Sequence, residues 1–206
     1  MLVLTDSMSL TRNSMKDWDA IYVNLLRKEF PSIEFVHLAI GKATIKTLEH
    51  QVLNYYIHLN PSVVILQCGI VDCAPRALYE LEQKLLRRLG LVYLVKPYAS
   101  FLRKHRRIFK TSQEEFRLSI LEIKRALPVP LITIGLSTPT LEHEKIVPGL
   151  TSQVKRFNEV LRLNSIFVCM GNLPERCLSD DFYHYNEDGH KYVAEMLSQQ
   201  LKRYVI

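Results

Sequence analysis

Short apolar runs and amphipathic stretches alternate along the whole chain. The apolar runs lie at residues 1–4, 34–40, 63–68, 131–135 and 166–170. All five are short, and the run at 63–68 is continuous enough to be buried on both faces, as a strand of a parallel sheet is. Between them, apolar residues recur at the three- and four-residue spacing of one helix face. The pattern predicts five β-strands that alternate with α-helices.

The predicted helices are marked by apolar faces and by residues that begin or end a helix. The face positions are Trp18, Ile21, Tyr22, Leu25 and Leu26; Ile45, Leu48, Val52 and Tyr56; Phe116, Ile120, Ile123 and Leu127; Leu150, Val154, Phe157 and Leu161; and Val193, Met196, Leu197, Leu201 and Tyr204. A capping box at residues 111–115 and a cap at Asn186 begin two of these helices. The stretch after the fourth strand contains Pro139 and Pro148 and is predicted as a loop.

Alternating strands and helices are typical of an α/β protein with a parallel sheet. Because crossovers between parallel strands are right-handed, the carboxyl ends of all five strands should lie along one edge. We therefore predict a three-layer α/β/α sandwich with a five-stranded, mostly parallel, flavodoxin-like sheet. The length fits a single domain that spans residues 1–206.

Residues 78–110 have a different character. Their basic residues are interleaved with Leu, Tyr and Phe, and are Lys84, Arg87, Arg88, Lys96, Arg103, Lys104, His105, Arg106, Arg107 and Lys110. We predict a helical insertion whose basic side faces solvent. Two interpretations remain open: a solvated helix face, or a patch that binds an anionic glycan or makes peripheral contact with a membrane. The chain carries no recognised nucleic-acid-binding motif, which argues against a nucleic-acid partner.

Composition narrows the class of protein. The chain is 48% hydrophobic and carries a net charge of +6, which favours an anionic partner. No apolar run approaches the about 20 residues of a transmembrane helix, and no basic leader precedes an apolar segment, so we expect a cytoplasmic protein. The four cysteines form no C-x-x-C pair and the histidines show no metal-ligand spacing. We therefore expect buried free thiols, no metal and no cofactor.

Polar residues follow the predicted strands at the edge where the carboxyl ends meet. Ser7 follows the first strand, Gly41 the second and residues 69–72 the third. Open α/β sheets bind ligands at this edge. Asp181 and His184 precede the last helix and would reach the same edge, completing a nucleophile, a base and an acid that orients the base. In the alternative interpretation, Ser7 and Asp181 are helix caps and His184 bonds a backbone carbonyl.

Four short blocks resemble those of the SGNH (GDSL-type) hydrolases. They are Thr5-Asp6-Ser7, Gly41, Gly69-Ile70-Val71-Asp72, and Asp181 to His184 followed by residues 186–194. The resemblance runs from end to end of the chain, with residues 78–110 as an insertion. It implies Ser7 as the nucleophile, His184 as the base and Asp181 as the residue that orients the base. It also implies that the backbone N–H groups of Ser7 and Gly41 bind the oxyanion.

Two positions depart from the family pattern. Thr5 replaces a glycine, and Val71 replaces an asparagine whose side chain is an oxyanion donor in the family. Valine cannot donate a hydrogen bond, and losing one such donor costs about 2.7–4 kcal/mol of transition-state stabilisation. Either the enzyme is slow, or Arg12 or Arg76 replaces the donor or contacts an anionic substrate group. The alternative for each arginine is a surface position or an ion pair with Asp72, itself a further candidate substrate contact.

The resemblance and the residue pattern together imply a serine esterase or deacylase. It would remove an O-acyl group, foremost an acetyl group, from a carbohydrate or a small-molecule ester through an acyl-enzyme on Ser7. Two alternatives remain open. One is an O-acyltransferase in surface polysaccharide biosynthesis, in which a sugar hydroxyl resolves the same acyl-enzyme. The other is a catalytically weak binding module for an anionic partner.

Overall fold

The sheet has the topology that the sequence predicts. A computed structural model describes residues 1–11 and 18–204. Within them, β1 (Leu2–Thr5), β2 (Val36–Ala39), β3 (Val64–Gln67), β4 (Leu131–Ile134) and β5 (Ile166–Val168) form one sheet. All its pairings are parallel and the order is β2-β1-β3-β4-β5, as in a flavodoxin-like fold. The predicted α/β sandwich is therefore confirmed, and β1 lies inside the sheet.

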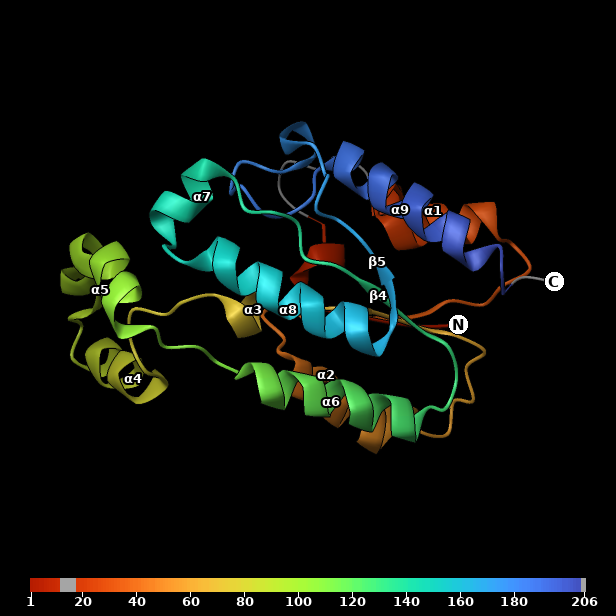
Figure 1. The fold of residues 1–206 in the computed structure, drawn as a ribbon, viewed down its shortest axis with the longest axis horizontal. Helices are drawn as coiled ribbons and strands as arrows, with labels where there is room; N and C mark the ends of the chain where they lie inside the picture. The colour runs from red at the N-terminus through yellow and green to blue at the C-terminus, as the bar shows by residue number, and fades with distance from the viewer. Residues whose placement is uncertain (12–17, 205–206) are drawn as a thin grey trace.

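Helices cover both faces of this sheet. On one face lie α1 (Tyr22–Glu29) and α9 (Glu187–Leu201); on the other lie α2 (Ile45–Gln51), α6 (Gln113–Ala126) and α8 (Leu150–Asn164) (Figure 1). Alternate residues of a strand point to opposite faces. Val3 and Ile65 accordingly pack in the core under α1 and α9, while Leu4 and Leu66 pack in the core under the other three helices.

Capping residues begin the helices where the sequence predicts. The Ser112 side chain accepts a hydrogen bond from the N–H of Glu115 at 3.2 Å and begins α6. Asn186 accepts one from the N–H of Gly189 at 3.0 Å and begins α9. The four cysteines are free, as expected, although Cys169 is exposed rather than buried.

Two predictions about helices are wrong. Trp18 was expected on the buried face of the first helix, but it lies in a short 3₁₀ turn, η2 (Trp18–Ala20), and is 56% exposed. The predicted loop after β4 contains α7 (Leu141–Ile146), whose first turn is capped by Thr140. A two-turn helix with no buried residue carries too little apolar periodicity to be recognised from the sequence.

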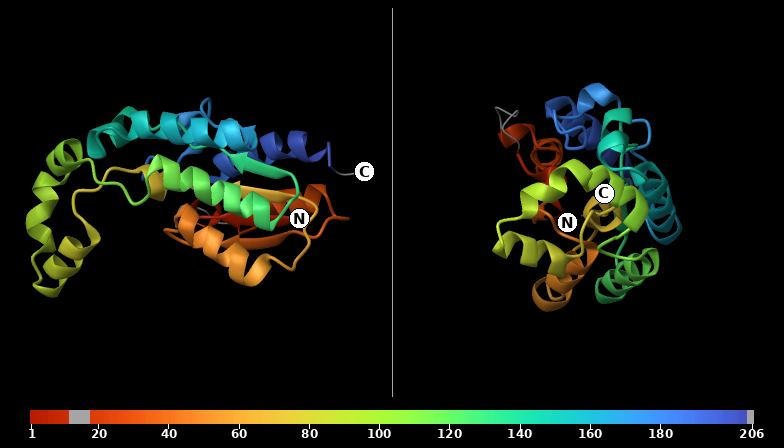
Figure 2. Two further views of the ribbon diagram at one scale, coloured as in Figure 1. Left: turned by 60° about the horizontal axis from the view of Figure 1, so that its bottom comes forward. Right: turned by 90° about the vertical axis from the view of Figure 1, so that its left-hand side faces the viewer.

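Residues 78–110, the basic segment of the sequence, contain three helical elements. They are α4 (Glu80–Arg88), the 3₁₀ segment η4 (Val92–Tyr98) and α5 (Ala99–Arg106). The N–H of Arg76 donates to the carbonyl of Ile108 at 2.7 Å, so the chain leaves and rejoins the body at neighbouring points. Figure 2 shows α4 and α5 standing away from the sheet. No helix in the described ranges is both long and apolar enough to span a bilayer.

Candidate active site

The candidate nucleophile lies in a tight turn at the carboxyl end of β1. Asp6 accepts a hydrogen bond from the N–H of Met8 at 2.9 Å and begins the 3₁₀ turn η1 (Ser7–Ser9). Ser7 is therefore the first residue of this turn, directly after a central strand. It is 6% exposed, and the neighbouring Asp6 is fully buried. The backbone holds the serine at the edge where parallel sheets bind ligands.

The structure brings Asp181 and His184 to this serine. His184 Nε2 lies 3.0 Å from Ser7 Oγ, and His184 Nδ1 lies 2.5 Å from Asp181 Oδ2. With its proton on Nδ1, the ring donates a hydrogen bond to the Asp181 carboxylate, and Nε2 can accept one from the Ser7 hydroxyl. The three residues predicted from opposite ends of the chain thus form a connected Ser-His-Asp arrangement.

Backbone groups hold the Asp181 carboxylate in front of the imidazole. Asp181 Oδ1 accepts the N–H groups of Tyr183 at 3.2 Å and His184 at 3.0 Å. Although partial burial opposes ionisation, these bonds and the bond to the His184 ring keep the pKa of Asp181 below its ordinary value. The carboxylate is therefore charged at neutral pH and can stabilise a protonated His184.

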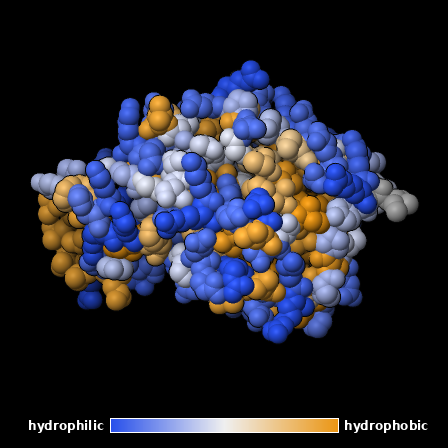
Figure 3. All heavy atoms as spheres, in the orientation of Figure 1, coloured by the Kyte–Doolittle hydropathy of each residue, from blue (hydrophilic) through white to orange (hydrophobic). Residues whose placement is uncertain are grey.

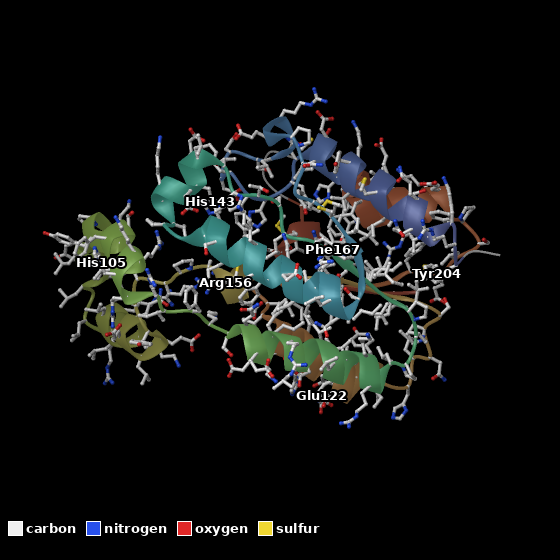
Figure 4. The ribbon with its side chains drawn as sticks, in the orientation of Figure 1. His105, Glu122, His143, Arg156, Phe167 and Tyr204 are labelled. Carbon is white, nitrogen blue, oxygen red and sulfur yellow. The ribbon has the colours of Figure 1, made fainter. Side chains whose placement is uncertain are left out.

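Tyr183 is part of the site and was not predicted. Its hydroxyl lies 3.3 Å from Ser7 Oγ, and its ring lies against that of His184 with centroids 3.7 Å apart. The ring of His143, a residue of α7 (Figure 4), has its centroid 5.7 Å from that of the Tyr183 ring. Tyr183 lies between Asp181 and His184 in the sequence. Its position directly before the candidate base is the sequence feature from which a role in the site could have been predicted.

Thr5 ties the nucleophile turn to the neighbouring strand. Its hydroxyl forms a short hydrogen bond with Ser9 and donates to the carbonyl of Leu38 at 3.3 Å. Ser9 Oγ lies 2.9 Å from His37 Nε2. Burial, with the charge of Arg27, lowers the pKa of His37 to about 4, so the ring is neutral at physiological pH. The threonine that replaces a glycine of the SGNH pattern therefore links β1, η1 and β2.

Gly41 lies beside the nucleophile turn. The preceding residue, Ile40, donates its N–H to the carbonyl of Thr5 at 3.0 Å. A Cβ placed on Gly41 would come within 3.7 Å of Leu10, directly after η1. The backbone after β2 therefore runs next to the turn that carries Ser7.

Asp72 is buried and its carboxylate is hydrogen-bonded within the protein. It is fully buried in α3 (Ile70–Cys73), where it accepts the N–H of Ile45 at 3.1 Å and the hydroxyl of Thr111 at 2.5 Å. Burial raises its pKa to about 6. Asp72 thus joins the start of α2 to the segment before α6, and we do not include it among the proposed substrate contacts. Val71 beside it is 8% exposed and has no hydrogen-bonding side chain.

Of the two arginines proposed as substitute oxyanion donors, the structure describes only Arg76. Arg12 lies outside the residues that the structure describes. Arg76 donates from Nη2 to the carbonyl of Val71 at 2.9 Å, and the described residues show no ion pair between Arg76 and Asp72. Arg76 also lines a cavity of about 510 Å³ between the body and the insertion. In the described parts of the chain, no cluster of three or more His, Cys, Asp or Glu residues could hold a metal.

Proteins with a similar three-dimensional structure are known. A lipase/acylhydrolase from Enterococcus faecalis aligns with 98% of this chain and 94% of its own, at a TM-score of 0.69 and 11% identity. A lipolytic protein of the G-D-S-L family from Veillonella parvula covers 98% of this chain and 97% of its own, at a TM-score of 0.63 and 12% identity. No protein-family model matches the chain, and no curated protein matches its sequence.

A third similar structure is a catalytic mutant of an acetylxylan esterase from Geobacillus stearothermophilus. It aligns with 97% of this chain and 92% of its own, at a TM-score of 0.59 and 15% identity. At these identities the similarity concerns the fold. The chain has the fold of the SGNH (GDSL-type) hydrolases, as its sequence blocks predicted.

Proposed function

We propose that this protein is a serine esterase or deacylase that removes a small O-acyl group through an acyl-enzyme on Ser7. The observation that carries the proposal is the connected set Ser7–His184–Asp181, with 3.0 Å between nucleophile and base and 2.5 Å between base and carboxylate. A nucleophile within reach of a base that a third group orients is the signature of nucleophilic catalysis by serine. The fold, shared with proteins described as esterases and acylhydrolases, supports the same reaction class.

The reaction proceeds in two halves. Ser7 Oγ attacks the ester carbonyl carbon while His184 Nε2 takes the hydroxyl proton. The tetrahedral intermediate then breaks its bond to the leaving alcohol, which receives that proton. Water next attacks the acyl-enzyme with His184 again as base, and the collapse of the second intermediate returns the proton to Ser7 and releases the acid. Asp181 keeps the proton on Nδ1 and stabilises the imidazolium.

The oxyanion is proposed to accept hydrogen bonds from the backbone N–H groups of Ser7 and Gly41. Backbone donors at fixed positions stabilise a developing negative charge without reorganisation. Gly41 suits this role because its backbone runs beside the nucleophile turn and carries no side chain there. Val71 adds no donor, so the proposed hole is weaker than one with an asparagine.

A small cavity beside the nucleophile supports an acetyl group as the acyl part. It holds about 20 Å³ and is lined by Met8, Leu136, Pro139 and Tyr183, among others. Tyr183 faces both this cavity and Ser7 Oγ. A space of this size accommodates a small apolar group such as the methyl of an acetyl ester. We propose a carbohydrate or another small molecule as the alcohol, a choice supported by the acetylxylan esterase among the similar structures.

Covalent labelling tests the proposal directly. A fluorophosphonate should modify the wild-type protein at Ser7 and should leave Ser7→Ala unmodified. Hydrolysis of p-nitrophenyl acetate should be lost in the same variant. Ser179→Ala is the matched control, because its hydroxyl bonds the carbonyl of Tyr185 in the same loop region and is not one of the three groups to which the proposal assigns catalysis. Absence of labelling in the folded wild-type protein would instead favour a binding module.

A further inference from the structure

The net positive charge of the protein is concentrated in one projecting segment. We call residues 79–107 the helical arm; it contains α4, η4 and α5. The arm has eight Lys and Arg residues against two Glu residues, a net charge of +6. This equals the net charge of the whole chain, so the remaining residues are neutral as a set. Any electrostatic attraction to an anionic partner is therefore centred on the arm.

Most of these cations are exposed and have no acidic partner. Glu82 binds Arg106 at 2.7 Å and Glu80 lies 3.4 Å from Lys110, so both acidic groups of the arm are occupied. Six exposed cations of the arm have no carboxylate within ion-pair distance among the described residues: Lys84, Arg87, Arg88, Lys96, Lys104 and Arg107. Their charges face solvent.

The arm also exposes apolar side chains. The described ranges contain eighteen exposed large hydrophobic residues, and eight of them lie in the arm: Tyr79, Leu81, Leu85, Leu89, Tyr93, Leu94, Tyr98 and Phe101. No residue of α4, η4 or α5, all of them described, is buried. The space-filling view shows apolar residues gathered at the end of the molecule that carries the arm, among hydrophilic ones (Figure 3).

On α4 the two kinds of residue form adjacent stripes. Leu81, Leu85 and Leu89 are spaced by four residues, so they follow one another along one side of the helix. They are 78%, 58% and 57% exposed. Lys84 and Arg88 each precede a leucine by one position and flank this stripe. An apolar stripe bordered by long cationic side chains is the arrangement of a helix that lies in a membrane interface.

We propose that the helical arm docks on an anionic phospholipid membrane. The leucine stripe of α4 enters the interface, and the cations beside it bind lipid phosphates while their aliphatic stems lie along the apolar boundary. A second copy of the chain does not fit, because two arms of net charge +6 repel each other. An apolar protein partner fits poorly, because it would bury cations of the arm that have no acidic partner among the described residues. The inference does not depend on the proposed hydrolase activity.

Vesicle binding tests the proposal. In sedimentation assays, the wild-type protein should bind vesicles of phosphatidylcholine with phosphatidylglycerol and should bind pure phosphatidylcholine far less. Lys84→Gln with Arg88→Gln should weaken binding about 30-fold, since each cation near such a surface contributes about fivefold. Leu81→Ser, Leu85→Ser and Leu89→Ser should each weaken it by on the order of tenfold.

Matched variants outside the arm test whether vesicle binding depends on the arm itself or only on the overall charge and exposed apolar residues of the protein. Lys124→Gln with Arg125→Gln removes the same charge from the end of α6, and Leu163→Ser removes a leucine that is 68% exposed on α8. Both controls should bind as the wild type does, apart from the small loss of general attraction. Equal loss in the controls, or no binding of the folded wild type to either vesicle, would overturn the proposal. The latter outcome would indicate an acidic protein partner.

Discussion

The hydroxyl of Tyr183 lies 3.3 Å from Ser7 Oγ, across 176 positions of sequence. The same ring lies against His184, so one aromatic residue contacts both the candidate nucleophile and the candidate base. Such a contact restricts the rotamers of both side chains. It makes Tyr183 a candidate positioning residue for the proposed reaction.

We expect Tyr183→Phe to lower kcat for p-nitrophenyl acetate about two- to tenfold, because one neutral hydrogen bond contributes about 0.5–1.5 kcal/mol. The ring against His184 is kept, so KM and thermal stability should change little. Tyr55→Phe, whose side chain is 68% exposed, is the control. If Tyr183→Phe changes KM alone, the hydroxyl contacts substrate and does not position Ser7.

Ser7→Ala and His184→Ala should each reduce kcat by on the order of 10⁴-fold or more, because members of one catalytic unit fail together. Asp181→Asn should lose about 10⁴-fold, since an amide no longer favours the required tautomer. Kinetics on one ester and circular dichroism of each variant provide the measurement. Wild-type turnover in folded Ser7→Ala would exclude the acyl-enzyme.

Val71→Asn should raise kcat about tenfold, because a donor to a charged oxygen contributes about 1.5–3 kcal/mol and part is lost in placing a polar group at a buried position. Val71→Leu introduces a side chain similar in size to asparagine but without a hydrogen-bond donor, so it should not raise kcat. Arg76→Ala tests the alternative that its guanidinium already serves the oxyanion. A flat response to Val71→Asn with a loss of on the order of 10²-fold in Arg76→Ala would favour that alternative.

Acid should destabilise the protein through His190. This residue is fully buried beside Tyr22 and Tyr185, and burial lowers its pKa to about 4. Below its unfolded pKa of about 6.5, the unfolded chain binds a proton that the folded protein does not, so the free energy of unfolding falls as pH falls. Between pH 6.5 and 5 the loss from this group should be about 2 kcal/mol.

Urea denaturation at several pH values checks this slope. His190→Gln does not titrate and should lose about 2 kcal/mol less than the wild type over that range. Asp72 acts in the opposite direction, because its raised pKa of about 6 makes the folded protein bind an extra proton between pH 3.8 and 6. Asp72→Asn should therefore steepen the loss on acidification. Identical slopes in the wild type and His190→Gln would contradict the assignment.

Much of the fold follows from local physics that the sequence carries. The apolar runs predicted all five strands, and the caps at Ser112 and Asn186 predicted two helix starts, because strand burial and capping depend on neighbouring residues. Parallel strands end at one edge, so the sequence alone predicts that Ser7, Asp181 and His184 lie close together. Their hydrogen bonds agree with that expectation.

Contacts between distant segments required the tertiary structure. The bond from Tyr183 to Ser7, the link from Thr5 through Ser9 to His37, and the burial of Asp72 depend on how loops pack, and no local spacing encodes that. The exposure of Leu81 and its neighbours is also a tertiary property. An apolar stripe predicts a buried helix face, and only the absence of a covering element in the described structure shows that this one faces solvent.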